Sequence, residues 1–216
     1  MRLLYGGTFD PVHEGHLAIA RAASAALAAP VWLLPAADPP HRAPPGASAA
    51  QRATMLELAV GCERALRVDR RELAREGPSY TIDTLAEVRA EIGATQPLVW
   101  VLGVDSLLQL DDWHHWRRLF EHAHLLGVER PGTRLEPDWL RERAPAVHAE
   151  LAARWSAPGA LADSPAGRYA PLPIVPLRDE SATEVRRRIA AGEDWSALVP
   201  PRVAGYIREQ GLYGCR

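Results

Sequence analysis

The chain contains no lysine, has only two cysteines, and lacks any hydrophobic run long enough to cross a membrane. Since all 25 basic residues are arginine, any cation that meets an anion here is a guanidinium able to bind two oxygens at once. Cys62 and Cys215 lie far apart and lack the spacing of a metal site, which predicts two reduced thiols in a cytoplasmic protein. The formal net charge of −2 excludes a global basic field. We therefore expect neither a membrane nor a nucleic acid as partner.

What the chain does contain is the composition of an ordinary folded protein, with 216 residues of which 47% are hydrophobic and 24% are charged. This length is enough for one α/β domain with a proper core. The N-terminal residues enter an apolar strand at once, so we expect no signal peptide. We expect a single domain over residues 1–216, with an α/β core over 1–180 and a small C-terminal helical segment over 181–216.

Short apolar runs alternate with helical patterns along the chain. Strands are expected at Arg2–Tyr5, Val31–Leu34, Leu66–Asp69, Leu98–Leu102, His124–Val128 and Leu172–Val175. Helices are expected at Gly15–Ala29, Ala49–Gly61, Tyr80–Ile92, Asp105–Leu110, Trp116–Phe120, Asp138–Ala153, Thr183–Ala190 and Arg202–Gln210. This alternation predicts an α/β fold, a Rossmann-like doubly wound parallel sheet that binds ligands at the C-terminal strand ends. Residues 38–47 and 157–173 are expected to be surface connections.

The most informative segment is residues 5–17, which read YGGTFDPVHEGHL and join the first predicted strand to the first predicted helix. A glycine-rich turn exposes backbone N–H groups, and the helix dipole adds positive potential, so this turn suits a phosphate. His13 and His16 lie where that anion would bind, and imidazole N–H groups can donate to phosphate oxygens. Gly15 between them leaves room for a polyphosphate against the backbone.

Other interpretations of this segment are weaker. A zinc protease motif needs two histidines at i and i+4, and here they are at i and i+3. A dinucleotide fingerprint needs G-x-G-x-x-G, which Gly6 and Gly7 do not begin. A structural turn that carries two histidines by coincidence stays open from these residues alone.

The segment resembles the signature of the HxGH nucleotidylyltransferases, and its GGTFDP opening looks most like the bacterial nicotinate-nucleotide adenylyltransferases. The resemblance implies that this turn binds ATP and that His13 and His16 are catalytic. The residues implied for ATP in this segment are Gly6, Gly7, Thr8, Phe9, His13, Gly15 and His16.

A second segment, ESATEVR at residues 180–186, begins the C-terminal helical part. Ser181 or Thr183 is a natural N-cap, so a plain capped helix is one interpretation. The segment is also similar to the family's Ile-Ser-Ser-Thr-x-x-Arg motif, which implies that Ser181, Thr183 and Arg186 bind the β- and γ-phosphates of ATP, with Arg186 as a third catalytic residue. Ala182 stands where the family has a second serine, which puts one hydroxyl contact in doubt.

Two further segments resemble the family's mononucleotide pocket. Residues 77–84 read GPSYTIDT, and Thr81 is implied to meet the pyridine carboxylate; a turn before a structural helix is the alternative. Gly103 and Asp105 follow a buried strand and are implied for ATP, with Asp105 accepting from a ribose hydroxyl. Trp113 is implied to stack on the pyridine ring, and the backbone amide of His114 to bind the carboxylate.

Two alternatives concern single residues of these segments. A tryptophan at such a place can also anchor the core, and we favour that role for Trp116 over a role in binding. Residues 39–42, PPHR, resemble a family loop that closes near the bound phosphates, and Arg42 is assigned to the nicotinate mononucleotide site. A solvated surface arginine is the alternative for Arg42.

The function that the resemblance implies is adenylyl transfer from ATP to nicotinate mononucleotide, giving deamido-NAD and pyrophosphate. Mg²⁺ is expected mainly on the ATP phosphates, with no metal site of the chain's own. Alternatives are a nicotinamide mononucleotide or pantetheine-phosphate adenylyltransferase, a cytidylyltransferase, a non-catalytic nucleotide-binding module and a tRNA synthetase fragment. The pantetheine and cytidylyl enzymes should lack the segments of Thr81 and Trp113. Whether the protein is a monomer or a dimer is left open.

Overall fold

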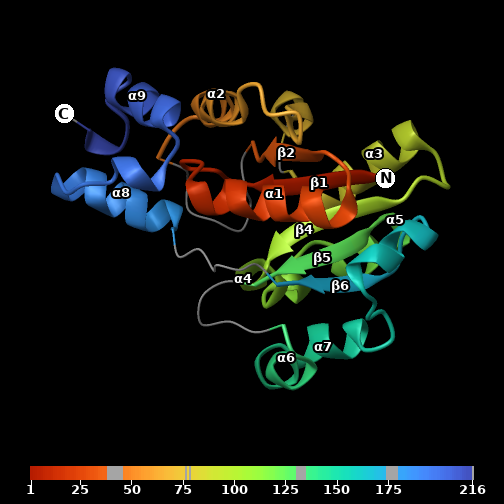
Figure 1. Cartoon of the computed structure of the whole chain (residues 1–216). Coiled ribbons are helices and arrows are strands. Elements are labelled where there is room, and N and C mark those ends of the chain that lie inside the picture. The colour runs from red at the N-terminus through yellow and green to blue at the C-terminus, as the bar shows by residue number, and fades with distance from the viewer. Residues whose placement is uncertain (38–45, 76, 78, 130–134, 174–179, 216) are drawn as a thin grey trace.

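Six parallel strands form the sheet at the centre of the part of the chain that the structure describes (Figure 1). The computed structural model describes residues 1–37, 46–75, 77, 79–129, 135–173 and 180–215. The strands are β1 (Arg2–Gly7), β2 (Val31–Pro35), β3 (Leu66–Val68), β4 (Leu98–Gly103), β5 (His124–Val128) and β6 (Tyr169–Leu172). Their spatial order, β3-β2-β1-β4-β5-β6, is that of a doubly wound Rossmann-like sheet, which confirms the predicted fold class.

Helices connect the strands and cover both faces of the sheet (Figure 1). The α-helices are α1 (Glu14–Leu27), α2 (Ala49–Val60), α3 (Thr81–Ile92), α4 (Val104–Leu107), α5 (Leu119–His122), α6 (Pro137–Arg143), α7 (Pro145–Leu151), α8 (Ala182–Ala191) and α9 (Pro201–Glu209). Short 3-10 helices are η1 (Arg71–Ala74), η2 (Leu110–Asp112), η3 (Trp116–Arg118), η4 (Pro158–Asp163), η5 (Ser196–Leu198) and η6 (Leu212–Gly214). Among the described residues, no helix has the length and apolar character needed to span a membrane.

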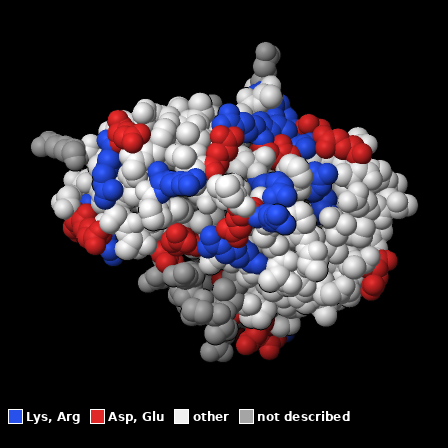
Figure 2. Space-filling view, turned by 45° about the horizontal axis from the view of Figure 1, so that its top comes forward, with Lys and Arg blue, Asp and Glu red and all other residues white. Residues whose placement is uncertain are grey.

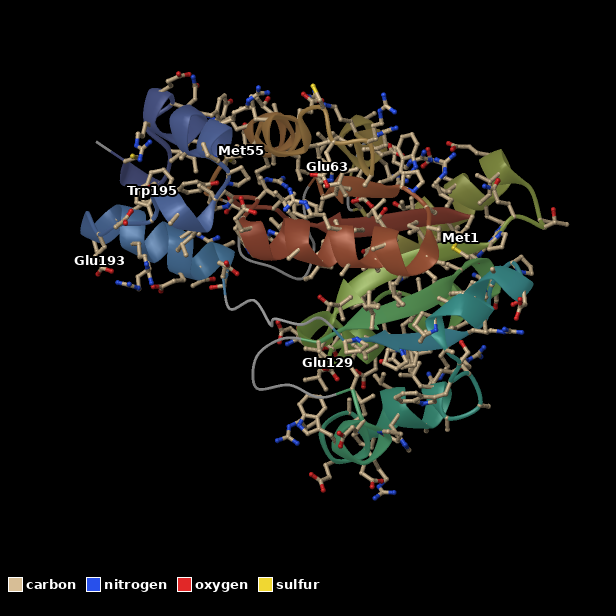
Figure 3. The ribbon with its side chains drawn as sticks, viewed as in Figure 1. Met1, Met55, Glu63, Glu129, Glu193 and Trp195 are labelled. Carbon is tan, nitrogen blue, oxygen red and sulfur yellow. The ribbon has the colours of Figure 1, made fainter. Side chains whose placement is uncertain are left out.

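The core lies on both faces of the sheet because successive side chains of a strand point to opposite sides. On β1, Leu3 and Tyr5 join the core beneath α1, α2, α8 and α9, whereas Leu4 joins the core beneath α3 to α7. Met55 of α2 and Trp195, which follows α8, belong to the first of these cores (Figure 3). The C-terminal helices therefore pack in the same core as α1 and α2.

The helix expected over Asp138–Ala153 is two helices, α6 and α7, so that prediction was wrong about its continuity. The break falls at Ala144, whose φ of −143° and ψ of 67° are not helical. Pro145 follows directly; it has no N–H to donate, and it disfavours helical geometry in the residue before it.

The helices predicted after β4 are also shorter than expected. α4 ends at Leu107 and η2 follows, while the pattern at 116–120 divides into η3 and α5. In this stretch the chain packs many buried side chains within a few residues before β5, and such tertiary packing overrides the weak preference of a short helix.

The last strand lies three residues earlier than predicted, inside a stretch that was expected to be a surface connection. Tyr169 is fully buried, and its ring lies against Gly127 of β5 and against Trp155. Pro171 is tolerated because β6 is an edge strand, where a residue without an N–H removes no ladder bond to an outer neighbour. Residues 174 and 175 of the predicted strand lie outside the described residues.

His124, the first residue of β5, predicts a pH dependence of folding. The side chain is fully buried, its Nδ1 accepts from the N–H of Arg168 at 3.0 Å, and its Nε2 lies 2.8 Å from the carbonyl oxygen of Ser164. This pairing fits a neutral ring with its proton on Nε2, and burial lowers the pKa of His124.

Because the folded pKa of His124 is lowered, the unfolded chain binds the proton first, and the free energy of unfolding should fall as pH drops below about 6.5. Urea unfolding between about pH 7.5 and about pH 5 measures this loss. His124→Gln should remove part of the dependence, whereas His148→Gln on the half-exposed side of α7 should keep it. An unchanged dependence in His124→Gln would reject this assignment.

Candidate active site

The candidate site lies where the order of the strands reverses, between β1 and β4. In doubly wound sheets, ligands bind in the crevice outside the carboxyl ends of the strands at this point. β1 ends at Gly7 and β4 ends at Gly103, and each is followed within a few residues by a helix, α1 or α4. The segment predicted to bind phosphate therefore lies at this edge of the sheet, toward which the strand arrows point in Figure 1.

His13 and His16 pack together at the start of α1. Their ring centroids are 3.6 Å apart, and the Phe9 ring meets that of His16 edge-on at 4.9 Å. His13 directly precedes α1 and is 1% exposed, and its backbone N–H donates to Nδ1 of His16 at 3.3 Å. Because Nδ1 of His16 accepts, the neutral ring carries its proton on Nε2, which can then donate to a ligand.

Gly15 lets the second predicted phosphate segment lie against the first. A Cβ at Gly15 would lie 3.0 Å from Nδ1 of His13 and 3.2 Å from the backbone oxygen of Glu180. Only glycine fits such a close approach without displacing one of these neighbours. The two segments, far apart in the sequence, therefore meet at the start of α1.

Gly6 and Gly7 have packing reasons of their own. A Cβ at Gly6 would collide with the ring of Trp100, and one at Gly7 would lie 3.0 Å from the ring of Phe9. These glycines were assigned to ATP, and their close contacts to side chains show that the local packing also requires them. Phe9 itself has a φ of 51°, so the turn holds a non-glycine residue in the left-handed region.

Helix α8 begins with the N-cap that the sequence predicted at Ser181 or Thr183. The Ser181 hydroxyl accepts from the N–H of Glu184 at 3.1 Å, so the cap at Ser181 is confirmed, and Thr183 is exposed in the first turn. One turn on, Arg186 reaches back to the first segment, where its Nη1 donates to the backbone oxygen of Asp10. The structure thus brings Arg186 beside the turn that carries His13 and His16.

The neighbouring charges on α8 are paired with each other. Arg187 and Arg188 both donate to Glu184, and these hydrogen bonds lower the pKa of Glu184 to about 2. In the view of Figure 2, arginines across the displayed face lie beside Asp and Glu residues and form no continuous basic surface. Arg186 differs from these arginines because it donates to main chain at the candidate site.

The residues predicted to bind a pyridine carboxylate come from two segments that touch. Thr81 is the first residue of α3, and Tyr80 before it provides no side-chain cap, so the first N–H groups of α3 are open to an anion. The rings of Tyr80 and His114 are 4.5 Å apart, which brings the turn at 113–115 to the start of α3.

The two tryptophans of that turn differ in their surroundings. Trp116 is 7% exposed, which confirms its predicted role in the core. Trp113 is partly buried and packs against the same core. Asp105 is exposed in α4, just after Gly103. Arg42 and the rest of residues 39–42 lie outside the described residues.

Arg52 of α2 is the site-supporting residue that our sequence reasoning missed. The side chain is fully buried, and its guanidinium donates to the backbone oxygens of Ala47, Thr8 and Ala37 at 3.3, 2.7 and 2.8 Å. It therefore joins the glycine-rich turn to both flanks of the segment between β2 and α2. A charged residue on the apolar face that also carries Met55 was the available signal.

Replacing Arg52 by methionine should lower the free energy of unfolding by about 3 kcal/mol or more. The variant keeps an unbranched apolar stem but removes the guanidinium, so the buried carbonyl oxygens lose their donor. Urea unfolding measures the change. Arg64→Met, at an exposed position before β3, is the matched control and should stay within about 0.5 kcal/mol of the parent. Equal losses in both variants would contradict the supporting role of Arg52.

Comparison with known proteins places these features in context. A family model described as cytidylyltransferase-like matches residues 4–188. A protein of Stenotrophomonas maltophilia (strain K279a) named "Probable nicotinate-nucleotide adenylyltransferase" is 54% identical, over 99% of this chain and 96% of that protein. A protein of the same name from Marinobacter nauticus is 44% identical, over 100% of this chain and 98% of that protein.

Solved structures resemble the fold over nearly its whole length. The Plasmodium falciparum nicotinic acid mononucleotide adenylyltransferase complexed with NaAD has a TM-score of 0.73 and 16% identity, and the match covers 99% of this chain and 97% of that one. The same enzyme complexed with APC has a TM-score of 0.71. At this identity the likeness shows the fold.

Proposed function

Because the chain belongs to the nicotinate-nucleotide adenylyltransferases of the cytidylyltransferase-like family, we propose that it transfers the adenylyl group of ATP to nicotinate mononucleotide, giving deamido-NAD and pyrophosphate. The observation that carries this proposal is the meeting of two phosphate segments at one edge of the sheet. Gly15 lies against the backbone of Glu180, and Arg186 donates to Asp10 beside the two histidines.

The chemistry asks for positioning and charge stabilisation from these residues. The attacking 5′-phosphate is already an anion, so the reaction needs no general base. It attacks the α-phosphorus of ATP in line, the bond to the β-phosphate oxygen breaks, and pyrophosphate leaves with that electron pair. Donors held in place at a helix N-terminus stabilise the charge that develops on the phosphoryl oxygens. Nε2 of His16 and the guanidinium of Arg186 are such donors.

We assign the roles of the individual residues as follows. The catalytic residues are His13, His16 and Arg186. ATP binding falls to Gly6, Gly7, Thr8, Phe9, His13, Gly15, His16, Gly103, Asp105, Ser181, Thr183 and Arg186. The mononucleotide is bound by Thr81, Trp113 and His114, to which we add Arg42 outside the described residues.

Mg²⁺ enters this proposal as part of the nucleotide substrate. Among the described residues, no three His, Cys, Asp or Glu side chains come close enough together to hold a metal ion. The ATP phosphates can themselves hold Mg²⁺, which neutralises part of their charge when bound. The free thiols of Cys62 and Cys215 support a reducing compartment, and we place the reaction in the cytoplasm.

A pyrophosphate-release assay with ATP and alternative acceptors tests the proposed function. Nicotinate mononucleotide should give pyrophosphate and deamido-NAD in equal amounts, whereas phosphopantetheine should give neither. Replacing ATP by CTP with the same acceptor distinguishes a cytidylyltransferase. Turnover of phosphopantetheine, or of CTP above ATP, would contradict the assignment.

Arg186→Lys should raise the KM for ATP roughly tenfold and leave the KM for nicotinate mononucleotide unchanged, because one ammonium cannot replace a two-pronged grip on phosphate oxygens. Steady-state kinetics with each substrate varied in turn measure this. Arg187→Lys is the matched control, since Arg187 pairs with Glu184 and Glu193 instead. If Arg186→Lys left the ATP kinetics unchanged, α8 would be a capped structural helix with no role in ATP binding.

A further inference from the structure

A buried aspartate joins four segments of the chain at the candidate site. The side chain of Asp10 is 6% exposed, and its oxygens accept from the backbone N–H groups of Gly46 at 2.8 Å and Ala47 at 3.0 Å. The phenol of Tyr213 donates to Oδ1 at 2.8 Å, across 203 positions of sequence. Nη1 of Arg186 lies 3.6 Å from Oδ2 and donates to the backbone oxygen of the same residue.

Three donors bind the Asp10 carboxylate, and Nη1 of Arg186 lies 3.6 Å from its Oδ2. A separation of 3.6 Å exceeds a charge-assisted hydrogen bond, which is about 2.7–2.9 Å. Among the described residues, the guanidinium of Arg186 has one hydrogen bond, to the backbone of Asp10. It is therefore oriented by that carbonyl while its other N–H groups remain available for phosphate oxygens.

Tyr213 of η6, near the C-terminus, packs closely against the Asp10 carboxylate. A Cβ at Gly46 would lie 3.0 Å from the Tyr213 ring, so the ring packs closely on the glycine whose N–H also binds Asp10. Tyr213 has a φ of 60°, in the left-handed region. Of the four described non-glycine residues with positive φ, three lie at the candidate site: Phe9, His115 and Tyr213. Such backbone strain persists only where the surrounding structure holds it, and it concentrates at functional sites.

The phenol of Tyr213 keeps its proton and can act as a donor throughout the working pH range. Burial, with the adjacent carboxylate of Asp10, raises the pKa of Tyr213 above its ordinary value. The hydrogen bond from Tyr213 to Asp10 therefore links η6 to the glycine-rich turn with the phenol as donor.

We propose that Asp10 and Tyr213 are positioning residues of the adenylyl transfer: the Tyr213 phenol and the two amides fix the Asp10 carboxylate so that Arg186 is presented to the phosphates of ATP. This proposal rests on the proposed function and adds the C-terminal tail to the ATP site. When the phenol is absent, Oδ1 keeps one donor, the carboxylate turns toward Arg186, and it competes with the phosphates for the guanidinium.

Tyr213→Phe tests the proposal because it removes one oxygen and keeps the ring that packs on Gly46. The KM for ATP should rise roughly tenfold, as expected for losing a hydrogen bond to a charged group, while the KM for nicotinate mononucleotide stays within about twofold. Tyr206→Phe on α9, whose hydroxyl has no partner among the described residues, is the matched control and should leave both constants unchanged. A lower melting temperature with unchanged ATP kinetics would overturn the proposal, because that is the result of a purely structural contact.

A double-mutant cycle asks whether Tyr213 acts through Asp10. Asp10→Asn places an amide where three donors converge and removes the carboxylate through which Tyr213 is proposed to act on Arg186. In the Asp10→Asn background, Tyr213→Phe should add less than a twofold change, since residues that act as a unit are not additive. Fully additive effects would overturn the proposal, and if Asp10→Asn does not fold, the kinetic comparison of Tyr213→Phe with Tyr206→Phe decides alone.

Calorimetric titration with ATP alone keeps this test separate from the proposed function. A parent protein that binds ATP but forms no dinucleotide would reject the proposed function. The roughly tenfold weaker ATP binding expected of Tyr213→Phe would still be measured in that titration, and equal ATP affinity in both proteins would overturn the role of Tyr213.

Discussion

His16→Ala is expected to lower kcat by roughly 100- to 1,000-fold and to change the KM for ATP only slightly. This is the usual cost of losing one donor that is held in place for the transition state. The ring of His16 is fixed by the N–H of His13 and by the ring of Phe9, so its Nε2 needs no reorganisation as charge develops. Steady-state kinetics with saturating nicotinate mononucleotide measure the effect.

The control for this prediction separates catalysis from capping. His16 accepts from the N–H of His13 at the third position of α1, which is the place of Gln or Glu in a capping box. His16→Gln should therefore keep the stability of the parent while still losing most of kcat, because it offers no ring N–H on the outer side. A kcat within threefold of the parent in His16→Ala would remove His16 from the mechanism.

The second large effect concerns the choice between two mononucleotides. Nicotinate mononucleotide should be preferred over nicotinamide mononucleotide by at least about 100-fold in kcat/KM. The open N–H groups at the start of α3, beside Thr81, suit a carboxylate, and the ring contact of Tyr80 brings His114 to the same place. The uncharged amide of nicotinamide would leave these N–H donors partly unpaired, and a buried donor without its acceptor lowers affinity strongly. Equal use of the two mononucleotides would show that the pocket is misplaced.

Trp113→Ala locates that pocket. Stacking of a pyridine ring contributes about 1 kcal/mol beyond burial, so the KM for the mononucleotide should rise at least fivefold while the KM for ATP stays nearly constant. Trp139→Ala, a partly buried tryptophan of α6 that stacks with Arg143, is the matched control and should change neither constant. A defect of Trp113→Ala confined to ATP would contradict the assignment.

Local signals in the sequence were enough to predict the parallel sheet and to single out the turn and the helix that the structure brings together. Apolar runs such as those of β1 and β4 are buried on both faces, and the glycine-rich turn and the helix of Arg186 both follow patterns within a dozen residues. The predicted element bounds were wrong where tertiary packing or a proline overrides the local sequence pattern. Pro145 breaks a helix whose pattern continues past it, and β6 forms because Tyr169 fills the space beside β5.

The contacts that support the site could not be predicted, because they join residues that are distant in the sequence. Arg52 donates to Thr8 across 44 positions, and Tyr213 donates to Asp10 across 203. On the distant side of these contacts, Arg52 and Tyr213 each offer only a polar group near apolar neighbours as a local signal. Only the fold shows that Asp10 of the glycine-rich turn and Arg52, which donates to Thr8 of that turn, both bind the backbone of Ala47.

The proposed reaction moves the α-phosphorus of ATP to the 5′-phosphate of nicotinate mononucleotide at the turn of His13 and His16. Parallel reactions with ATP labelled at the α-phosphate or at the γ-phosphate test this most directly. The α-label should appear in deamido-NAD and the γ-label in pyrophosphate, with both transfers lost together in His16→Ala. An α-label recovered as AMP, or a γ-label transferred to the acceptor, would show that adenylyl transfer to the mononucleotide is not the reaction at this turn.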